Sequence, residues 1–310
     1  MAKIAVELEK AVARRALEGT PGGTTMRCLA AGDGWKVGDV LCTSGPGDRP
    51  FEERHETVAV VLVTAGTFQY RSAAGRELMT PGSLMLGNAG QAFECGHEHG
   101  RGDRCLSFHY DPDYFEDLAA DAAGGARSRI ARASRTASGI REFFHPLRLP
   151  PLRPMSSVVA RALAGLAGSV CVSWEELSLQ MAARALRLAS GLAPGSAAVS
   201  PAATARVTRA VRRIERDPGY GVSLRELARE ARLSPYHFLR IFRHLTGVTP
   251  HQYVRRLRLR AAATQLAMGP GRIADVAFDS GFGDVSNFNH AFRTEFGTSP
   301  RVYRLGSRTA

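Results

Sequence analysis

Long apolar runs and a cysteine count suited to disulfide pairing are both missing from this sequence of 310 residues. No stretch of roughly 18 or more consecutive apolar residues occurs, so the sequence predicts no membrane-spanning helix. Residues 1–19 carry Glu7, Glu9 and Lys10 through their middle, which excludes the apolar core of a secretory signal. The 5 cysteines are an odd number in a long chain, which favours reduced thiols over a disulfide framework. These absences together predict a cytoplasmic protein that does not enter a membrane.

One helical pattern occurs twice in the last third of the chain, between residues 223 and 304. In the first copy, Ser223 and Glu226 form a capping box that begins one helix, and Ser234 begins a second. The apolar residues of the first helix return at an offset of 49 residues, and those of the second helix at an offset of 50. The positions that share the larger offset are Phe238, Phe242, Gly247, Pro250 and Tyr253, which return as Phe288, Phe292, Gly297, Pro300 and Tyr303. Each copy is therefore predicted to be a helix, a tight turn that absorbs the extra residue, and a second helix.

Positive charge is concentrated in the same part of the chain. Residues 201–310 contain 19 arginines and 8 acidic residues, so this third holds a net charge of +11 out of +12. A helix-turn-helix lays its second helix in the major groove of DNA, and clustered arginines neutralise phosphates. A plain helical bundle is the alternative, and the crowding of arginine argues against it.

Residues 204–304 resemble the DNA-binding domain of the AraC/XylS family of bacterial transcription factors. The resemblance rests on residues 274–282, which read Ala-Asp-Val-Ala-Phe-Asp-Ser-Gly-Phe, then on Phe288, Phe292, Phe296-Gly297 and residues 299–304. It implies seven helices, with two helix-turn-helix units bridged by one long helix over about Pro250–Met268. It also implies that the two units read two successive major-groove segments on one face of double-stranded DNA, and that RNA polymerase is a partner.

The resemblance also transfers candidate groove residues to the matching positions of the two second helices. They are Tyr236, Leu239 and Arg240 in the first copy, and Ser286, Asn287 and His290 in the second. Arg240 suits the O6/N7 edge of guanine, and Asn287 suits adenine. Leu239 replaces a residue that is commonly polar in the family, so it is expected to touch a thymine methyl group or nothing. Tyr236 and His290 could instead contact phosphate, and an ordinary solvated role is the alternative for all six.

Residues 26–110 change to short apolar runs that are separated by glycine and proline turns. The predicted strands are Val37–Cys42, Val58–Val63, Thr67–Tyr70, Ser83–Leu86, Ala92–Cys95 and Cys105–Tyr110. Strands at this spacing favour an antiparallel barrel or jelly roll. Residues 61–66 and 81–86 resemble the cupin-like ligand-binding domain that often precedes this DNA-binding domain. Where a metal-binding cupin has a second histidine after the first, here His55 is followed by Glu56 and Thr57, which puts the usual cupin metal site in doubt.

The richest set of ligand-forming side chains lies between residues 93 and 109. It comprises Cys95, His97, His99, Cys105 and His109. If residues 100–103 form a hairpin turn, His99 lies opposite Cys105 and His97 lies opposite Ser107. That arrangement would gather two thiols and up to three imidazoles, which suits a zinc-like metal ion, a reversible disulfide or the polar anchors of an organic effector. The plainest alternative is that these residues line a barrel wall.

The remaining segments complete the predicted domain organisation. The domains are an N-terminal helix over 1–22, a cupin-like sensor domain over 23–154, a helical pair over 155–192, a linker over 193–203 and the DNA-binding domain over 204–306. In the helical pair, Ser156 is expected to cap the first helix, and Ser173 with Glu176 the second. In relatives such a pair commonly forms a homodimer, and packing against the chain's own barrel is the alternative.

The predicted fold class is α+β and multi-domain, with a cupin-like antiparallel β-barrel and a helical pair before an all-α domain with two helix-turn-helix units. The leading hypothesis is a DNA-binding transcriptional regulator, more an activator than a repressor, that a small-molecule or metal effector controls through the N-terminal domain. One alternative is a metal- or redox-responsive regulator that uses Cys95, His97, His99 and Cys105. Others are a domain that senses another protein, and a cupin-like enzyme tethered to DNA. No catalytic residue is assigned, because no further set of histidines and carboxylates has the spacing of metal ligands.

Overall fold

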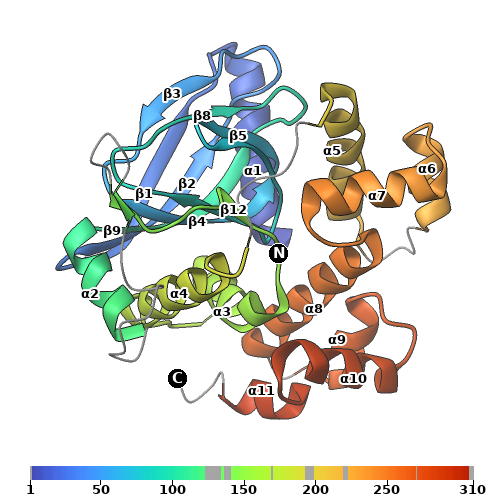
Figure 1. Cartoon of the computed structure of the whole chain (residues 1–310). Coiled ribbons are helices and arrows are strands. Elements are labelled where there is room, and N and C mark those ends of the chain that lie inside the picture. Colours follow the sequence, from blue (N-terminus) through green and yellow to red (C-terminus); the bar gives the residue numbers. More distant parts are fainter. Residues whose placement is uncertain are drawn as a thin grey trace. The chain divides into compact units, whose positions relative to one another are not determined.

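The computed structural model describes residues 2–122, 134–135, 141–168, 170–192, 199–218, 223–269 and 271–306. The chain forms two compact units (Figure 1). The sheet unit consists of Ile4–Pro150 and Ser173–Val199, and the helical unit consists of Met1–Lys3, Pro151–Val172 and Ser200–Ala310. After residue 150 the chain therefore passes from the sheet unit into the helical unit, returns to the sheet unit at residue 173, and enters the helical unit again at residue 200. Within the described ranges, no helix combines the length and the apolar character that crossing a bilayer requires.

Two antiparallel sheets build the sheet unit, in the strand orders β1-β2-β9-β4-β7-β12 and β3-β8-β5-β6. The first contains β1 (Thr24–Gly32), β2 (Trp35–Cys42), β4 (Val58–Gly66), β7 (Leu84–Gly87), β9 (Asp103–Tyr110) and β12 (Arg148–Leu149). The second contains β3 (Phe51–Arg54), β5 (Phe68–Ser72), β6 (Gly75–Met79) and β8 (Ala92–Gly96), while β10 (Ser134–Arg135) pairs with β11 (Arg141–Glu142). The six predicted strands are confirmed. The sequence did not predict β1, β3 and β6, whose exposed or charged residues leave no long apolar run.

An apolar cluster lines the space between the two sheets. Val61 and Val63 of β4 meet Tyr70 of β5 and Phe93 of β8 there. Such β-branched and aromatic side chains pack well on a pleated surface that is buried on one side. This cluster forms the walls of the cavity that is described below.

The N-terminal helix α1 (Ala2–Glu18) buries Ile4, Leu8 and Ala11. Arg104 of β9 links this helix to the larger sheet. Its Nε and Nη2 each donate to the carboxylate of Asp39 in β2 at 2.9 Å, and its Nη1 donates to the backbone oxygen of Ile4. A forked pair of charge-assisted hydrogen bonds fixes geometry as well as charge, so Arg104 sets where α1 lies.

Two further helices belong to the sheet unit. α2 (Pro112–Ala122) packs on α4 (Trp174–Ala189), and α4 also packs on β1, β2, β4 and β12 (Figure 1). The predicted cap of α4 is confirmed, because Ser173 accepts a hydrogen bond from the backbone nitrogen of Glu176. The hydroxyl of Tyr110 in β9 donates to the carbonyl of Ser178 at 2.8 Å. This helix therefore packs on its own barrel, one of the two alternatives that the sequence left open.

The helical unit contains the seven helices that the family resemblance implied. They are α5 (Pro201–Arg216), α6 (Leu224–Glu230), α7 (Pro235–Thr246), α8 (Pro250–Met268), α9 (Ile273–Asp279), α10 (Val285–Phe296) and α11 (Pro300–Gly306). In Figure 1, α8 runs between the pair α6–α7 and the pair α9–α10, and it contacts α7, α9 and α10. The bounds of α8 are those predicted for the bridging helix. α5 begins inside the predicted linker, of which residues 193–198 lie outside the described ranges.

Equivalent caps confirm the doubled pattern. The capping box of Ser223 and Glu226 has both of its hydrogen bonds. In α7 and α10, Ser234 and Asp284 accept from the backbone nitrogens three residues on. Both of these helices end at a left-handed glycine. Local hydrogen bonding therefore begins and ends both second helices in the same way.

The helix α3 (Ser156–Leu166) belongs to the helical unit, so the structure separates it from α4, with which the sequence paired it. Its Ala160 lies in the buried cluster formed by α8, α9 and α10. Ser156 does not cap the helix as predicted: it follows the short turn η1 (Arg153–Met155) as the first helical residue, and its Oγ donates to Glu295 of α10. An apolar stripe predicts a helix but does not identify the surface on which that stripe packs.

Candidate nucleic-acid interface and ligand cavity

The first recognition helix, α7, presents the predicted groove residues to solvent. The side chain of Tyr236 is 76% exposed, Arg240 is also exposed, and Leu239 is half-buried between them. Phe238 and Phe242 on the other face of α7 are fully buried. The apolar stripe therefore fixes the rotation of the helix, and this rotation leaves the predicted contact residues free for a partner.

The second recognition helix, α10, repeats this arrangement. Ser286, Asn287 and His290 are exposed, whereas Phe288 and Phe292 are fully buried. The structure therefore places all six predicted groove residues on two equivalent helices. Five of them are exposed and the sixth, in α7, is half-buried.

In each helix-turn-helix, the turn before the recognition helix contains one residue in the left-handed conformation. This residue is a glycine in the second copy but not in the first. Arg232 has a φ of 54° in the first turn, and Gly281 has a φ of 81° at the matching place in the second. The backbone nitrogen of Leu233 bonds to the oxygen of Ala228 at 2.9 Å, and Phe282 repeats this bond at 3.0 Å. A left-handed non-glycine residue costs about 1–2 kcal/mol, so the tight turn is retained in the first copy despite strain.

A small recess beside the second recognition helix is rich in positive charge. Its volume is about 180 Å³. The residues around it are His251, Val254, Arg255, Arg258, Gly281, Phe282, Gly283 and Asn287. Arg258 donates from Nη1 to the carbonyl of Gly281 at 2.8 Å, which ties α8 to the turn before α10. The recess thus places basic groups of α8 next to Asn287, a predicted groove residue.

A cavity of about 740 Å³ lies between the two sheets of the other unit. Most of its wall is apolar, including Val61, Phe68 and Met85. The ionisable residues on its wall are Cys42, Glu53, Arg54, His55, Glu56, Cys95, Asp103, Cys105 and His109. Its size suits a small organic molecule, and apolar side chains combined with polar groups that can orient a ligand are typical of a ligand pocket.

The hairpin turn considered for residues 100–103 does not form, because β8 and β9 lie in different sheets. Cys95 is paired with Tyr70 of β5, and Cys105 is paired with Val40 of β2 and Val63 of β4. Residues 97–102 therefore connect one sheet to the other instead of forming a tight turn.

The predicted ligand set is consequently divided. Cys95, Cys105 and His109 line the cavity, and His99 lies in the connection between β8 and β9. His97 bonds to Asp103 and lies near Cys42, two residues that the sequence did not single out. No sequence spacing signalled this group, because Cys42 ends a strand in a distant part of the chain.

Two histidines of the cavity wall have partners of their own. His55 Nε2 lies 2.8 Å from the hydroxyl of Tyr70, and its ring stacks on Phe93 with centroids 4.1 Å apart. Burial, with a smaller contribution from the charge of His109, lowers the pKa of His55 to about 4. The pKa of His109 is also lowered by burial, and its Nδ1 lies 3.1 Å from Oγ1 of Thr57. Both imidazoles are therefore neutral at neutral pH and can anchor a ligand by hydrogen bonds.

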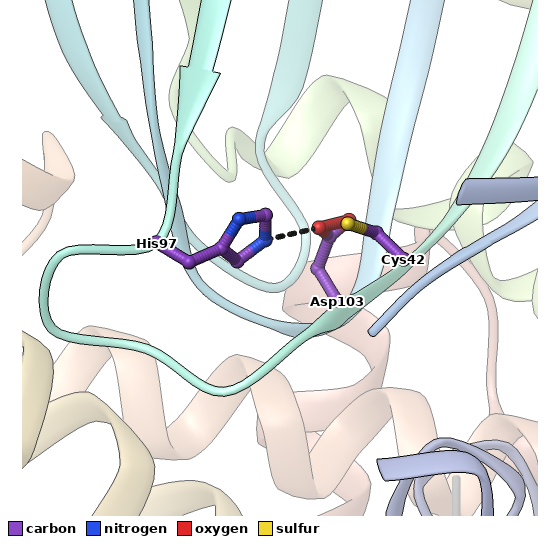
Figure 2. Close-up of side chains that lie close together, drawn as sticks. All are labelled: Cys42, His97 and Asp103. Carbon is purple, nitrogen blue, oxygen red and sulfur yellow. Dashed lines mark hydrogen bonds and ion pairs between the residues drawn. The ribbon is translucent and has the colours of Figure 1, made fainter. Parts of the chain in front are cut away.

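Cys42, His97 and Asp103 form a compact buried group at one end of the cavity wall (Figure 2). The Nε2 of His97 donates to Oδ1 of Asp103 at 2.8 Å. One potential ligand atom from each of the three residues lies within 4.8 Å of the other two. Cys42 is directly opposite Asp103 in the β2–β9 register, which explains why the two meet.

The charges of this group stabilise one another. Burial and the charge of Asp103 would raise the pKa of the Cys42 thiol, but the hydrogen bonds with His97 and Ser44 and the charge of His97 together lower it below its usual value. Burial would lower the pKa of His97, but hydrogen bonds with Asp103 and Cys42 raise it to about 9. Cys95 and Cys105 differ, because burial and the charge of Asp103 raise the pKa of both thiols well above the usual value. The pKa of Cys42 is therefore shifted in the opposite direction from those of Cys95 and Cys105.

A cavity-bearing barrel and a doubled helix-turn-helix define a class of protein that carries a ligand-binding domain and a DNA-binding domain on one chain. Comparison with known families agrees with this class. Residues 41–166 match the family described as an AraC-like ligand binding domain, and residues 227–306 match the family described as a helix-turn-helix domain. The chain therefore carries an AraC-like ligand binding domain followed by a helix-turn-helix domain, which agrees with the resemblance to the AraC/XylS family.

Individual curated relatives match about a quarter of this chain. The HTH-type transcriptional activator RhaS of Klebsiella pneumoniae (strain 342) is 40% identical over 81 residues, which are 26% of this chain and 29% of the relative. The probable transcriptional regulator LumQ of Photobacterium leiognathi is 39% identical over 84 residues, which are 27% of this chain and 34% of the relative. The chain therefore spans about a third or less of the length of these curated relatives.

Two solved structures are also similar. The DNA-binding domain of AdpA, solved in complex with a target DNA, is 28% identical with a TM-score of 0.32, and the match covers 34% of this chain and 94% of that one. ToxT from Vibrio cholerae is 13% identical with a TM-score of 0.34, and the match covers 92% of this chain and 98% of that one.

Proposed function

We propose that this protein is a sequence-specific DNA-binding transcriptional regulator, more an activator than a repressor, which an effector controls through the sheet unit. The observation that carries the proposal is the pair of exposed recognition faces on α7 and α10 in an arginine-rich unit. RhaS and LumQ, whose names describe transcriptional regulators, are similar to part of this chain, and RhaS is named an activator. The protein would act in the bacterial cytoplasm with RNA polymerase as a partner, and it would have no catalytic role.

Each recognition helix would enter one major-groove segment and read base edges there. Arg240 would donate to O6 and N7 of a guanine, and Asn287 would pair with N6 and N7 of an adenine. Leu239, half-buried in α7, would contact a thymine methyl group or no base. Tyr236 and His290 would touch phosphate, and Ser286 could bond to either a base or phosphate.

The recess beside α10 supports a phosphate contact between the two recognition segments. Arg255 and Arg258 lie on α8, the helix that bridges the two helix-turn-helix units, and they share the recess with Asn287. An arginine can bind phosphate through two parallel hydrogen bonds, and such contacts set the register of the protein on DNA. We assign Arg255 this positioning role, because Arg258 is already bonded to the turn before α10.

The effector would bind in the cavity between the two sheets. The apolar wall would bury the body of a small organic molecule, and neutral His55 and His109 would orient its polar group. A metal ion is a second candidate for the effector, because Cys42, His97 and Asp103 form a compact set of ligand atoms at the same cavity.

The path of the chain supports a way for ligand binding in the cavity to affect the DNA-binding helices. Met85 of β7 lines the cavity, and its partner across the strand pair is Arg148 of β12. Three residues separate β12 from η1, and α3 follows η1 directly. The helix α3 packs on α8 and α10. A ligand that favours one position of β12 would thereby change the population of DNA-binding arrangements.

A homodimer is part of the proposal, because paired helices in this segment commonly dimerise in relatives. The helix α4 remains the candidate surface, since its Leu179 is 40% exposed. Sedimentation of the full chain and of Leu179→Glu would test it. A wild type that stays monomeric at all concentrations would remove this part of the proposal.

The deciding experiment is a selection of random duplex oligonucleotides with the full-length protein. The expected result is one enriched motif with two half-segments about one helical turn apart, because the two recognition helices read one face of the DNA. Affinity should fall steeply with salt, since several arginines would displace counter-ions from phosphates. A selection that enriches no motif, or binding that salt does not weaken, would contradict the proposed function.

A further inference from the structure

The group of Cys42, His97 and Asp103 carries an inference that the DNA-binding function does not require. We propose that these three side chains bind a divalent transition-metal ion of the zinc class, with a fourth coordination position that opens into the cavity. The site is distinct from the usual cupin site, whose first histidine would be His55. His55 instead bonds to Tyr70 and stacks on Phe93. The inference deepens the proposed effector control by naming the chemistry of the cavity.

The ligand atoms match this class of ion. A thiolate sulfur, an imidazole nitrogen and a carboxylate oxygen are all zinc ligands, and three protein ligands with an open position are typical of zinc sites that also bind a small molecule. In a tetrahedral site the sulfur and nitrogen lie roughly 3.6 Å apart, so ligand atoms within 4.8 Å of one another need only small side-chain movements to close on an ion. The hydrogen bond between His97 and Asp103 already brings two of these atoms together.

Burial and ligand type favour a transition-metal ion in this position. Only 3% of Cys42 and 5% each of His97 and Asp103 are exposed to solvent. A divalent ion bound here would coordinate three polar side chains that water does not reach. The soft sulfur ligand favours zinc, cobalt or copper over magnesium or calcium, which prefer oxygen.

The backbone holds the ligands without relying on a mobile loop. Cys42 and Asp103 end and begin two paired strands, β2 and β9. Gly102 immediately before Asp103 has a φ of 67°, and a Cβ atom there would lie 2.5 Å from the carbonyl oxygen of Cys42. Glycine at position 102 thus permits the close approach of the two strands at this point. His97 follows β8 of the other sheet, so an ion here would join the two sheets.

The cavity lies next to the proposed open position. Cys42 and Asp103 both line it, together with Cys95 and Cys105. The Cys105 thiol donates to the second carboxylate oxygen of Asp103 at 3.4 Å, which orients the carboxylate toward His97. An effector with an oxygen, nitrogen or sulfur donor could complete the coordination from the cavity side.

The test is a titration of the untagged, chelator-treated full chain with Co²⁺, followed by displacement with Zn²⁺. We expect one equivalent of cobalt to produce a thiolate-to-cobalt charge-transfer band and the visible bands of a tetrahedral site. Cys42→Ser should lose the charge-transfer band, and Asp103→Asn should bind cobalt at least about tenfold more weakly. Cys28→Ser and Cys171→Ser are the matched controls, because both thiols are exposed and lie outside the cavity, and each should keep the wild-type spectrum.

A second measurement on the wild type covers the case in which Cys42→Ser does not fold. Zinc should protect Cys42 from alkylation, as peptide mapping would show, while Cys28 and Cys171 should react equally with and without zinc. A wild type that produces no band, a band that survives in Cys42→Ser, or a Cys42 that zinc does not protect would overturn the proposal and leave the group as a structural hydrogen-bond cluster. These readouts need no DNA, so a failure of the metal site is distinguishable from a failure of the proposed DNA binding.

Discussion

Ser156 at the start of α3 donates a hydrogen bond from its Oγ to Oε1 of Glu295 in α10, a residue 139 positions later in the chain. Both side chains are buried, and the same carboxylate oxygen lies 3.5 Å from Nε of Arg256 in α8. One carboxylate thus ties the helix that follows the barrel to both the bridging helix and the second recognition helix. This contact makes α3 a part of the DNA-binding unit.

Replacing Glu295 should destabilise the helical unit. Glu295→Ala leaves the guanidinium of Arg256 and the hydroxyl of Ser156 without their shared partner, at an expected cost of about 3 kcal/mol in the free energy of unfolding. The control is Glu230→Ala, which removes a surface ion pair with Arg213 and should cost less than about 1 kcal/mol. Urea unfolding followed by circular dichroism measures both. Equal losses in the two variants would show that the Glu295 contact does not hold α3 in place.

The left-handed cap of α10 gives a prediction about backbone conformation alone. Gly297 has a φ of 76°, and a Cβ atom added there would meet nothing within 4 Å. Gly297→Ala should therefore cost about 1–2 kcal/mol through backbone strain, which lowers the melting temperature by several degrees. Gly269→Ala is the matched control, because Gly269 has an extended φ of −162° and similar open space. A melting temperature for Gly297→Ala equal to that of the control would contradict this reasoning.

A buried carboxyl group in α5 should make stability depend on pH. Burial raises the pKa of Glu215 to about 8, although Arg212 and a hydrogen bond with Tyr253 oppose the shift. The folded state therefore keeps a proton that the unfolded chain releases at the ordinary glutamate pKa of 4.5. Its contribution is fully present below about pH 4.5 and is lost as the pH rises toward 8, at up to about 1.4 kcal/mol per unit.

Glu215→Gln removes this titration and keeps the shape of the side chain. Urea unfolding of both proteins at several pH values between about 5 and 8 should show the wild type losing stability relative to the variant. Parallel pH profiles would mean that Glu215 is ionised in the folded protein.

Substitutions of two arginines in the helical unit should affect DNA binding differently, because one residue is proposed to contact a base and the other to contact phosphate. Arg240→Ala should weaken binding to the selected DNA by about 1–3 kcal/mol and relax the preference at one base pair, because it removes a guanine contact. Arg255→Ala should weaken all sequences alike and reduce the salt dependence by about one counter-ion. Binding isotherms on the selected site and on single-base variants measure both effects. An unchanged base preference in Arg240→Ala would refute its role in reading.

The sequence by itself determined most of the helical unit, because the features that specify it are local. A capping box such as Ser223 with Glu226 is made between residues three positions apart, and a left-handed glycine ends a helix wherever it stands. The family resemblance implied the bridging helix over about Pro250–Met268, and the structure has the same bounds. The groove residues followed from the family resemblance together with the apolar stripe that fixes the rotation of each recognition helix.

Only the tertiary structure decided which strands pair and which surfaces meet. The alternation of β8 and β9 was readable, but their placement in separate sheets was not, because strand pairing depends on contacts between distant residues. For that reason the predicted ligand set was divided, and Cys42 and Asp103 joined His97 instead. The sequence likewise predicted a helix after Ser156, but it did not predict that Ser156 bonds to Glu295, which lies 139 residues away. Local hydrogen bonds join residues that are close in the sequence and can be predicted from it, whereas packing partners depend on how the whole chain folds.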